Sequence, residues 1–206
     1  FFLPFGNVPE TCAGRPFLRG YGIWGGINRF DPPWWLKRNP DHRLGFLIGH
    51  GEVLSDARNQ VCLSQRCDPL DVPMPHISCR WRANETAMVQ DMQNTIEDCI
   101  NVAGGVMTSL ADQVHLPLVK PLVAKALSAQ EDAPPPGYYI HEVGGAPMGT
   151  SEENSVVDRW NRLWRCPNVL VVDGACWPSS GWQSPTLTMM AITRRACLAA
   201  IMPGND

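Results

Sequence analysis

The sequence predicts an α+β protein whose C-terminal part is a fragment of an α/β sheet. Three patterns support this prediction. Short runs in which apolar and polar residues alternate precede residue 82, which is typical of an antiparallel sheet with one exposed face. Residues 84–105 then repeat apolar side chains every four positions, and residues 168–201 indicate a buried strand followed by a helix.

Three runs form the predicted antiparallel sheet: residues 43–56, 59–64 and 75–82. In the third run, Ile77, Cys79 and Trp81 alternate with polar side chains, as expected for a strand that turns one face toward a core. Residues 1–43 contain several glycines and prolines and show no sustained period, so we expect loops there.

The first predicted helix follows this sheet. Its apolar residues share one face and are expected to pack in the core: Met88, Met92, Ile96 and Ile100. Asn84 is suited to cap the start of the helix, and Gly104 with Gly105 is suited to end it. Residues 122–130 predict a second, shorter helix.

Residues 131–137, "EDAPPPG", predict an extended linker that divides the chain into 1–137 and 138–206. In the second part, residues 168–175 form a continuous apolar run that is typical of a buried parallel strand. Residues 184–201 predict a helix with Ser184 as its N-cap. Its apolar face comprises Leu187, Met190, Ala191, Leu198 and Ile201. Because one parallel strand leaves its edges unpaired, we expect it to complete a sheet formed by another segment.

Composition excludes several classes of protein. The chain has 206 residues, of which 44% are hydrophobic and 18% charged, and a net charge of −3. This charge provides no basic surface for nucleic acid, and no apolar run reaches the length of a membrane span. The eight cysteines include no C-x-x-C pair, so we do not expect a zinc site. The sequence does not indicate whether the protein is secreted or cytoplasmic.

Gly20, Gly22 and Gly25 spell G-x-G-x-x-G, the motif of dinucleotide-binding folds. That motif requires a buried strand before it and a helix that begins within it. No apolar run precedes the glycines, and Pro32 with Pro33 prevents a helix after them. We therefore interpret the motif as a glycine-rich turn and expect any nucleotide to bind elsewhere.

The helix predicted from residue 184 offers one such place. Its first N–H groups and its dipole favour negative charge, and the loop at 176–183 would let a planar ring approach the backbone. A reduced flavin, whose negative charge gathers at N1 and O2, has these properties.

The whole C-terminal segment resembles the signature of the glucose–methanol–choline (GMC) oxidoreductases, a family of FAD-dependent enzymes. In that signature a histidine precedes a glycine-rich stretch with a methionine, and "SVVD", a strand ending in "DG" and "PTLT" at a helix start follow. The matching residues are His141, Gly144, Gly145, Met148, Gly149, Ser155 to Asp158, Asp173, Gly174 and Pro185 to Thr188. The "HEVGG" form looks most like the sugar and polyol dehydrogenases of the family.

The resemblance implies that residues 138–206 are the C-terminal part of a Rossmann-like FAD-binding domain and that residues 1–137 belong to the substrate-binding domain. It implies FAD as the cofactor, contacted by Ile140, Asp173, Gly174, Pro185 and Thr186. The implied reaction is oxidation of an alcohol, sugar or polyol. His141 would accept the hydroxyl proton while the substrate carbon gives hydride to the flavin.

Ser184 departs from the family pattern, which usually has Asn or His at this position as the second catalytic side chain. Serine can donate and accept a hydrogen bond, but it is shorter than asparagine. It therefore either reaches the substrate oxygen with help from a water molecule or merely caps the helix.

The Rossmann unit that begins the family's FAD domain is a second departure, because this sequence lacks it. We therefore predict the C-terminal half of a split or cleaved enzyme, in a heteromer with a second polypeptide that carries the N-terminal Rossmann half. Two alternatives stay open: a lyase on the same flavin scaffold, and a non-catalytic subunit that binds a partner or a flavin.

Overall fold

The computed structural model describes four stretches of the chain: residues 2–6, 14–27, 43–108 and 136–202. The chain divides into two compact units, each built from two stretches of sequence. The first unit comprises Phe1–Glu52 and Trp81–Tyr138, and the second comprises Val53–Arg80 and Tyr139–Asp206. The predicted helix at 122–130 lies outside the described residues, and the predicted domain division at residue 137 stays a prediction.

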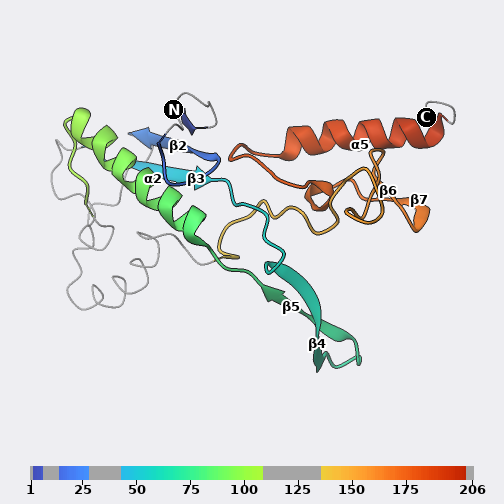
Figure 1. Ribbon diagram of the computed structural model, residues 1–206. Helices are drawn as coiled ribbons and strands as arrows, with labels where there is room; N and C mark the ends of the chain where they lie inside the picture. The colour runs from blue at the N-terminus through green and yellow to red at the C-terminus, as the bar shows by residue number, and fades with distance from the viewer. Residues whose placement is uncertain (1, 7–13, 28–42, 109–135, 203–206) are drawn as a thin grey trace. The chain divides into compact units, whose positions relative to one another are not determined.

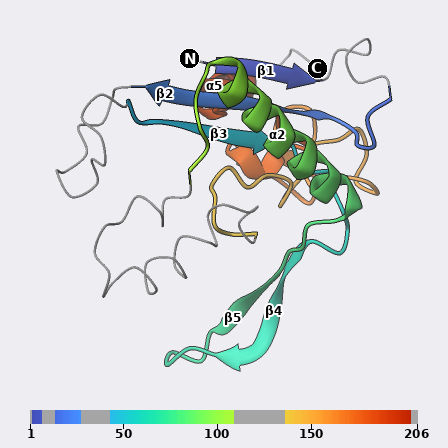
Figure 2. The same cartoon turned by 90° about the vertical axis from the view of Figure 1, so that its left-hand side faces the viewer.

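The first unit contains a three-stranded antiparallel sheet with a helix across one face (Figures 1 and 2). The sheet order is β1 (Phe2–Gly6), β2 (Gly20–Ile27) and β3 (Gly45–Gly51), and the helix is α2 (Ala83–Val102). Strand side chains alternate between faces, so Tyr21 and Ile23 of β2 share the face toward the helix. They are fully buried with Met88 and Met92 of α2 and with Phe17.

The prediction that residues 1–43 form only loops is wrong, because β1 and β2 lie among them. Gly20, Gly22 and Gly25 lie in the central strand β2, not in a turn. A Cβ atom at Gly25 would overlap the backbone oxygen of Phe46 and lie 2.6 Å from Leu47 Cδ2. The glycine therefore permits close pairing with β3. Both neighbours of β2 are antiparallel, so the motif does not open a βα unit.

The predicted apolar stripe of the first helix is confirmed for Met88, Met92 and Ile96, whereas Ile100 is only half-buried and lies outside the core cluster. Met92 packs over Gly49 of β3, where its sulfur occupies the space that a Cβ atom would take. Met88 packs over Gly51 in the same way, with its Sδ 2.6 Å from the position of an ideal Cβ atom. The two glycines pair with Ile23 and Tyr21 across the sheet. The methionines therefore fill the recess that the glycines leave.

Asn84 does not cap α2, which begins at Ala83 after Arg82. Instead Glu85 accepts a hydrogen bond from the Arg82 backbone amide at 2.9 Å, and Asn84 accepts one from the Leu18 amide at 2.7 Å. The predicted end of the helix is confirmed, because Gly104 adopts a φ of +73° just after it.

A polar cluster lies beside the core of the first unit. The Tyr21 hydroxyl donates to Asp91 Oδ2 at 2.6 Å and lies 2.8 Å from Thr95 Oγ1, and Arg15 Nη1 lies 3.1 Å from the same Asp91 oxygen. Burial raises the pKa of Tyr21, and the hydrogen bond to Asp91 adds to the rise. The hydroxyl therefore stays protonated and joins β2 to α2.

In the second unit, β4 (Gln60–Cys67) and β5 (Pro73–Ser78) form a two-stranded antiparallel hairpin. The prediction that 43–56 joins these strands in one sheet is wrong, because β3 pairs with β2. The prediction of one buried face is also wrong, since Val61 and Ile77 on one face and His76 on the other are exposed.

The C-terminal part contains β6 (Arg162–Leu163), β7 (Cys166–Leu170), the 3₁₀ turn η1 (Gly174–Cys176) and the helix α5 (Thr186–Ile201). The predicted parallel strand at 168–175 is wrong. Only Trp164 and Arg165 separate the pair Leu163 and Cys166, so β7 folds back antiparallel on β6 and is largely exposed. The predicted C-terminal helix is confirmed. Among the described residues, no helix is long and apolar enough to cross a membrane.

Replacing Gly25 with alanine tests the role of the glycine motif. We expect Gly25→Ala to lower the free energy of unfolding by roughly 1–3 kcal/mol. The new methyl group meets the backbone oxygen of Phe46, which is held in strand β3 and cannot shift unless the strand shifts with it. Chemical denaturation of both proteins measures the difference. Gly145→Ala is the matched control, since a Cβ there would lie an ordinary 3.8 Å from the Ala175 Cβ. Equal loss in both variants would contradict the strand-pairing role of Gly25.

Candidate functional site

The sequence-predicted site residues lie in the second unit, where a glycine-rich loop runs along η1. The loop begins at His141 and passes Gly144. Three backbone hydrogen bonds join the two segments: the amides of Gly144, Ala146 and Met148 donate to the carbonyls of Gly174, Ala175 and Cys176 at 3.4, 2.8 and 2.8 Å. The loop that carries His141 is therefore fixed in register with the predicted cofactor-binding "DG" pair.

Gly174 is the closest point between this loop, η1 and α5. A Cβ atom there would lie 2.9 Å from the carbonyl oxygen of Glu142 and 3.1 Å from Met189 Cε. Glu142 directly follows His141, and Met189 belongs to the first turns of α5. A side chain at this position would push the Glu142 carbonyl, and with it the loop, away from η1, whereas the end of the flexible Met189 side chain could turn aside.

The backbone of His141 is strained. Its φ is +84°, a left-handed conformation that costs a residue with a side chain about 1 kcal/mol. The side chain is half-buried. Such conformations persist where the surrounding structure holds them, and they cluster at functional sites. The conformation thus supports a functional interpretation of His141.

Asp173 and Thr186 border one shallow hollow of about 490 Å³ beside α5. Asp173 Oδ1 accepts a hydrogen bond from the Ala175 amide at 3.1 Å and so caps η1. The remaining lining is mostly apolar, with one cation: Val172, Met189, Met190, Thr193 and Arg194. The structure therefore brings together two of the predicted cofactor-binding residues, one before η1 and one at the start of α5.

The N-terminus of α5 has no side-chain cap. The helix begins at Thr186, and Pro185, which is buried, already has helical angles of φ −84° and ψ −12°. The prediction that Ser184 caps the helix is therefore wrong: Ser184 lies one residue further out and is exposed. The first amide groups of α5 are left as donors that no described side chain caps.

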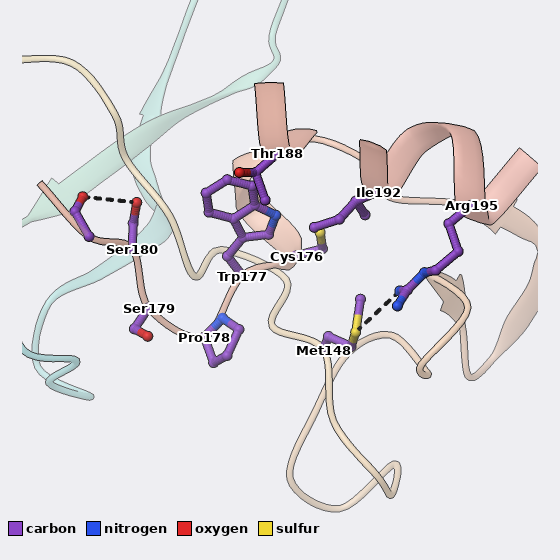
Figure 3. A pocket seen from close by; sticks show the side chains of 10 residues that line it. Met148, Cys176, Trp177, Pro178, Ser179, Ser180, Thr188, Ile192 and Arg195 are labelled. Atoms are coloured by element: carbon purple, nitrogen blue, oxygen red, sulfur yellow. Dashed lines mark hydrogen bonds between the residues drawn. The ribbon is translucent and has the colours of Figure 1, made fainter. Parts of the chain in front are cut away.

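A second hollow, of about 380 Å³, lies on the other flank of α5 (Figure 3). Trp177 and Pro178 line it from the loop, and Thr188, Ile192 and Arg195 line it from the helix. The indole Nε1 of Trp177 is buried and has no hydrogen-bond partner among the residues that the structure describes. No sequence pattern marks this donor, because its burial depends on how the loop packs.

Asn161 is a second residue that the sequence analysis missed. It is fully buried, donates to the Val171 carbonyl at 2.8 Å and accepts a hydrogen bond from Arg195 Nη2 at 3.2 Å. Its amide also donates to Cys176 Sγ at 3.2 Å. Burial raises the pKa of the Cys176 thiol, so this cysteine is a neutral packing residue. Asn161 thereby connects α5 to η1.

Ile140, Gly174 and Pro185 line neither hollow, and the same holds for the predicted catalytic residues His141 and Ser184. Ile140 is 73% exposed. No group of three or more His, Cys, Asp or Glu side chains within the described stretches is placed to hold a metal ion.

Comparison with known proteins agrees with this architecture. A family model for GMC oxidoreductases matches residues 55–193. The 2-methyl-1,2-propanediol dehydrogenase of Mycolicibacterium austroafricanum is 39% identical over 192 residues, which is 89% of this chain and 31% of the relative. The fructose dehydrogenase large subunit of Gluconobacter japonicus is 28% identical over 81% of this chain and 26% of its own length. Paromamine 6'-oxidase of Streptomyces fradiae is 42% identical over 59 residues, which is 29% of this chain and 11% of the relative.

The family match covers more than half of the chain and includes His141, η1 and the first two turns of α5. The chain spans under a third of the length of these relatives. The chain belongs to the GMC oxidoreductase family.

Proposed function

We propose that the chain is the C-terminal part of an FAD-dependent enzyme that oxidises the CH–OH group of an alcohol, sugar or polyol. The observation that carries the proposal is the strained His141 loop, which closes on Gly174 within a chain of this family. The names of the relatives support the substrate class, since they include a diol dehydrogenase and a fructose dehydrogenase.

The residues around α5 fit FAD. The uncapped amides at Thr186 suit the carbonyl oxygens of a flavin ring, which gain negative charge on reduction. The Asp173 carboxylate, which uses Oδ1 to cap η1, is an acceptor suited to hydroxyl groups of the ribityl chain. Gly174 lets the His141 loop pack against η1 beside this site, and Pro185 and Ile140 would add apolar contacts. When bound, FAD supplies the hydride acceptor.

His141 is the proposed proton acceptor. Imidazole exchanges a proton readily near neutral pH, so it can take the proton of the substrate hydroxyl as the substrate carbon loses hydride. Three hydrogen bonds join the loop to η1 between three and seven residues after His141.

Ser184 is the proposed second contact to the substrate oxygen. Its hydroxyl is not used as a helix cap, and the side chain is exposed directly before α5. A hydroxyl can donate to the substrate oxygen and orient it toward His141. The short side chain favours a substrate that approaches closely or a bridging water molecule.

The second proposed component is a polypeptide that carries the N-terminal Rossmann half of the FAD domain. The chain spans 31% and 26% of the length of two relatives. The two-residue strand β6 and the exposed strand β7 do not form an FAD-binding sheet by themselves.

Replacing His141 with alanine tests the proton transfer. In the assembly with the companion polypeptide, we expect His141→Ala to slow anaerobic bleaching of the flavin by alcohol about 10²- to 10⁴-fold, because the general base is lost. Stopped-flow absorbance measures the rate, and flavin content measures cofactor binding, which should not change. The control is His76→Ala, an exposed histidine on β5.

An unchanged bleaching rate in His141→Ala would remove His141 from the mechanism. An assembly without flavin would overturn the proposed function as a whole. A flavin that stays oxidised while the wild-type assembly cleaves a cyanohydrin would replace oxidation with lyase chemistry.

Two substitutions at Ser184 test the second contact. Ser184→Ala should lower kcat/KM roughly fivefold, since one hydrogen bond is worth about 1 kcal/mol. Ser184→Asn, which restores the longer side chain usual in the family, should retain or raise kcat/KM. Steady-state kinetics with a saturating electron acceptor measure both. If Ser184→Ala matches the wild type, the hydroxyl does not contact the substrate.

A further inference from the structure

The loop between η1 and α5 carries Ser184, the proposed second contact to the substrate oxygen. Hydrogen bonds hold this loop at both ends: the Trp177 amide donates to an η1 carbonyl at 3.1 Å, and the Pro185 carbonyl accepts from an α5 amide at 3.0 Å. The stretch between these ends, residues 178–184, contains one internal hydrogen bond, from the Ser180 hydroxyl to the next carbonyl at 3.3 Å. Such a stretch keeps one conformation only if another part of the chain holds it.

Ser55 supplies this support from a distant part of the sequence. Its hydroxyl Oγ donates to the Pro178 carbonyl oxygen at 2.8 Å, and the two residues lie 123 positions apart. Both residues belong to the second unit. Within the part of the chain that the structure describes, this is the one hydrogen bond that reaches residues 178–184 from outside the loop. The Ser55 hydroxyl is therefore the polar tether of the loop.

The backbone that carries Ser55 is itself fixed by side chains. Asp56 Oδ1 accepts a hydrogen bond from the Arg58 amide at 2.8 Å, and the two Asp56 oxygens accept from the Arg58 guanidinium at 2.9 and 2.6 Å. Next to this turn, Asn59 Oδ1 accepts from the Arg80 amide at 3.0 Å, at the end where β4 and β5 separate. An aspartate that bonds the backbone two residues later stabilises a turn. The tether thus starts from an ordered segment.

Proline makes the tethered carbonyl an effective anchor. The ring of Pro178 fixes its own φ at about −65°, so ψ is the soft dihedral that sets the direction of its carbonyl. The hydrogen bond from Ser55 fixes that direction, and with it the direction in which the chain continues along the hollow beside α5 (Figure 3). At the far end, Pro185 restricts the residue before it to extended conformations. Loss of the Ser55 hydroxyl would free the start of the loop while its end stays in place.

We infer that Ser55 is a positioning residue for the proposed reaction. Its hydroxyl holds the Pro178 carbonyl, and thereby residues 178–184, in the conformation in which Ser184 meets the substrate oxygen. The inference rests on the proposed function, because it is there that Ser184 contacts the substrate. Ser55 acts on turnover through Ser184, so removal of the Ser184 hydroxyl should also remove the effect of Ser55.

A double-mutant cycle in the assembly with the companion polypeptide tests this coupling. Ser55→Ala should lower kcat/KM about threefold, and Ser55→Thr, which keeps a hydroxyl, should restore it. In a Ser184→Ala background, Ser55→Ala should have no further effect. Steady-state kinetics measure all four proteins of the cycle. The control is Ser64→Ala, which should match the wild type, because the Ser64 hydroxyl donates to the Arg66 carbonyl within the hairpin at 3.1 Å.

Cleavage by chymotrypsin tests the tether without turnover. The bond after Trp177 resists this protease because Pro178 follows it, so Trp182 is the tryptophan at which the loop can be cut. Ser55→Ala should speed cleavage after Trp182 about fivefold, since a loop is cut in its open state and one hydrogen bond changes that population about fivefold. Mass spectrometry of the fragments measures the rate. Ser55→Thr and Ser64→Ala should be cleaved at the wild-type rate.

Unchanged kcat/KM in Ser55→Ala would overturn the inference, and so would a wild-type cleavage rate after Trp182 in this variant. Additive losses in the double variant would also overturn it, because Ser55 would then act by a route other than Ser184. The same holds if Ser55→Thr behaves like Ser55→Ala. If the assembly resists cleavage at Trp182, the kinetic cycle decides alone. An assembly without flavin would refute the proposed function, and the cleavage rates would still show whether Ser55 holds the loop.

Discussion

The close approach at Gly174 is the constraint on which the candidate site depends. A Cβ atom at this position would lie 2.9 Å from the backbone carbonyl oxygen of Glu142, which is too close unless the His141 loop shifts. The constraint is steric, so it selects glycine without stabilising the site by itself. Stabilisation comes from the backbone hydrogen bonds between the loop and η1, which become possible only because the segments can close on each other.

These hydrogen bonds also explain how His141 can keep an unfavourable backbone. A left-handed φ costs about 1 kcal/mol, which is comparable to the net contribution of one hydrogen bond. Three backbone hydrogen bonds to η1 follow within seven residues of His141, so the loop itself offsets the cost of the left-handed conformation. The result is a loop whose backbone after His141 is held in register with η1.

The sequence predicted elements whose signals are local. The methionine stripe of α2 and the helix of α5 are periodic within a few turns, and their existence was correctly predicted. Strand pairing was not predicted, because it depends on partners far along the chain: β3 pairs with β2 rather than β4. The glycines of β2 resemble a turn until Phe46 and Leu47 are known to lie against them. Ser184 fails as a cap because Pro185 is already helical.

The missed residues of the site share one property, which is that burial gives them their role. In the sequence, Trp177 and Asn161 are ordinary polar side chains. In the folded loop, the Trp177 indole N–H is buried without an acceptor among the described residues, and Asn161 connects η1 to α5 through hydrogen bonds.

The same reasoning applies to α5 as a whole. Periodicity identified its apolar residues but not which side faces inward, because both sides are apolar. The second unit buries the side of the helix centred on Ala196 and leaves Leu187 and Met190 on the other side exposed, so only the packing, and not the periodicity, distinguishes the two sides.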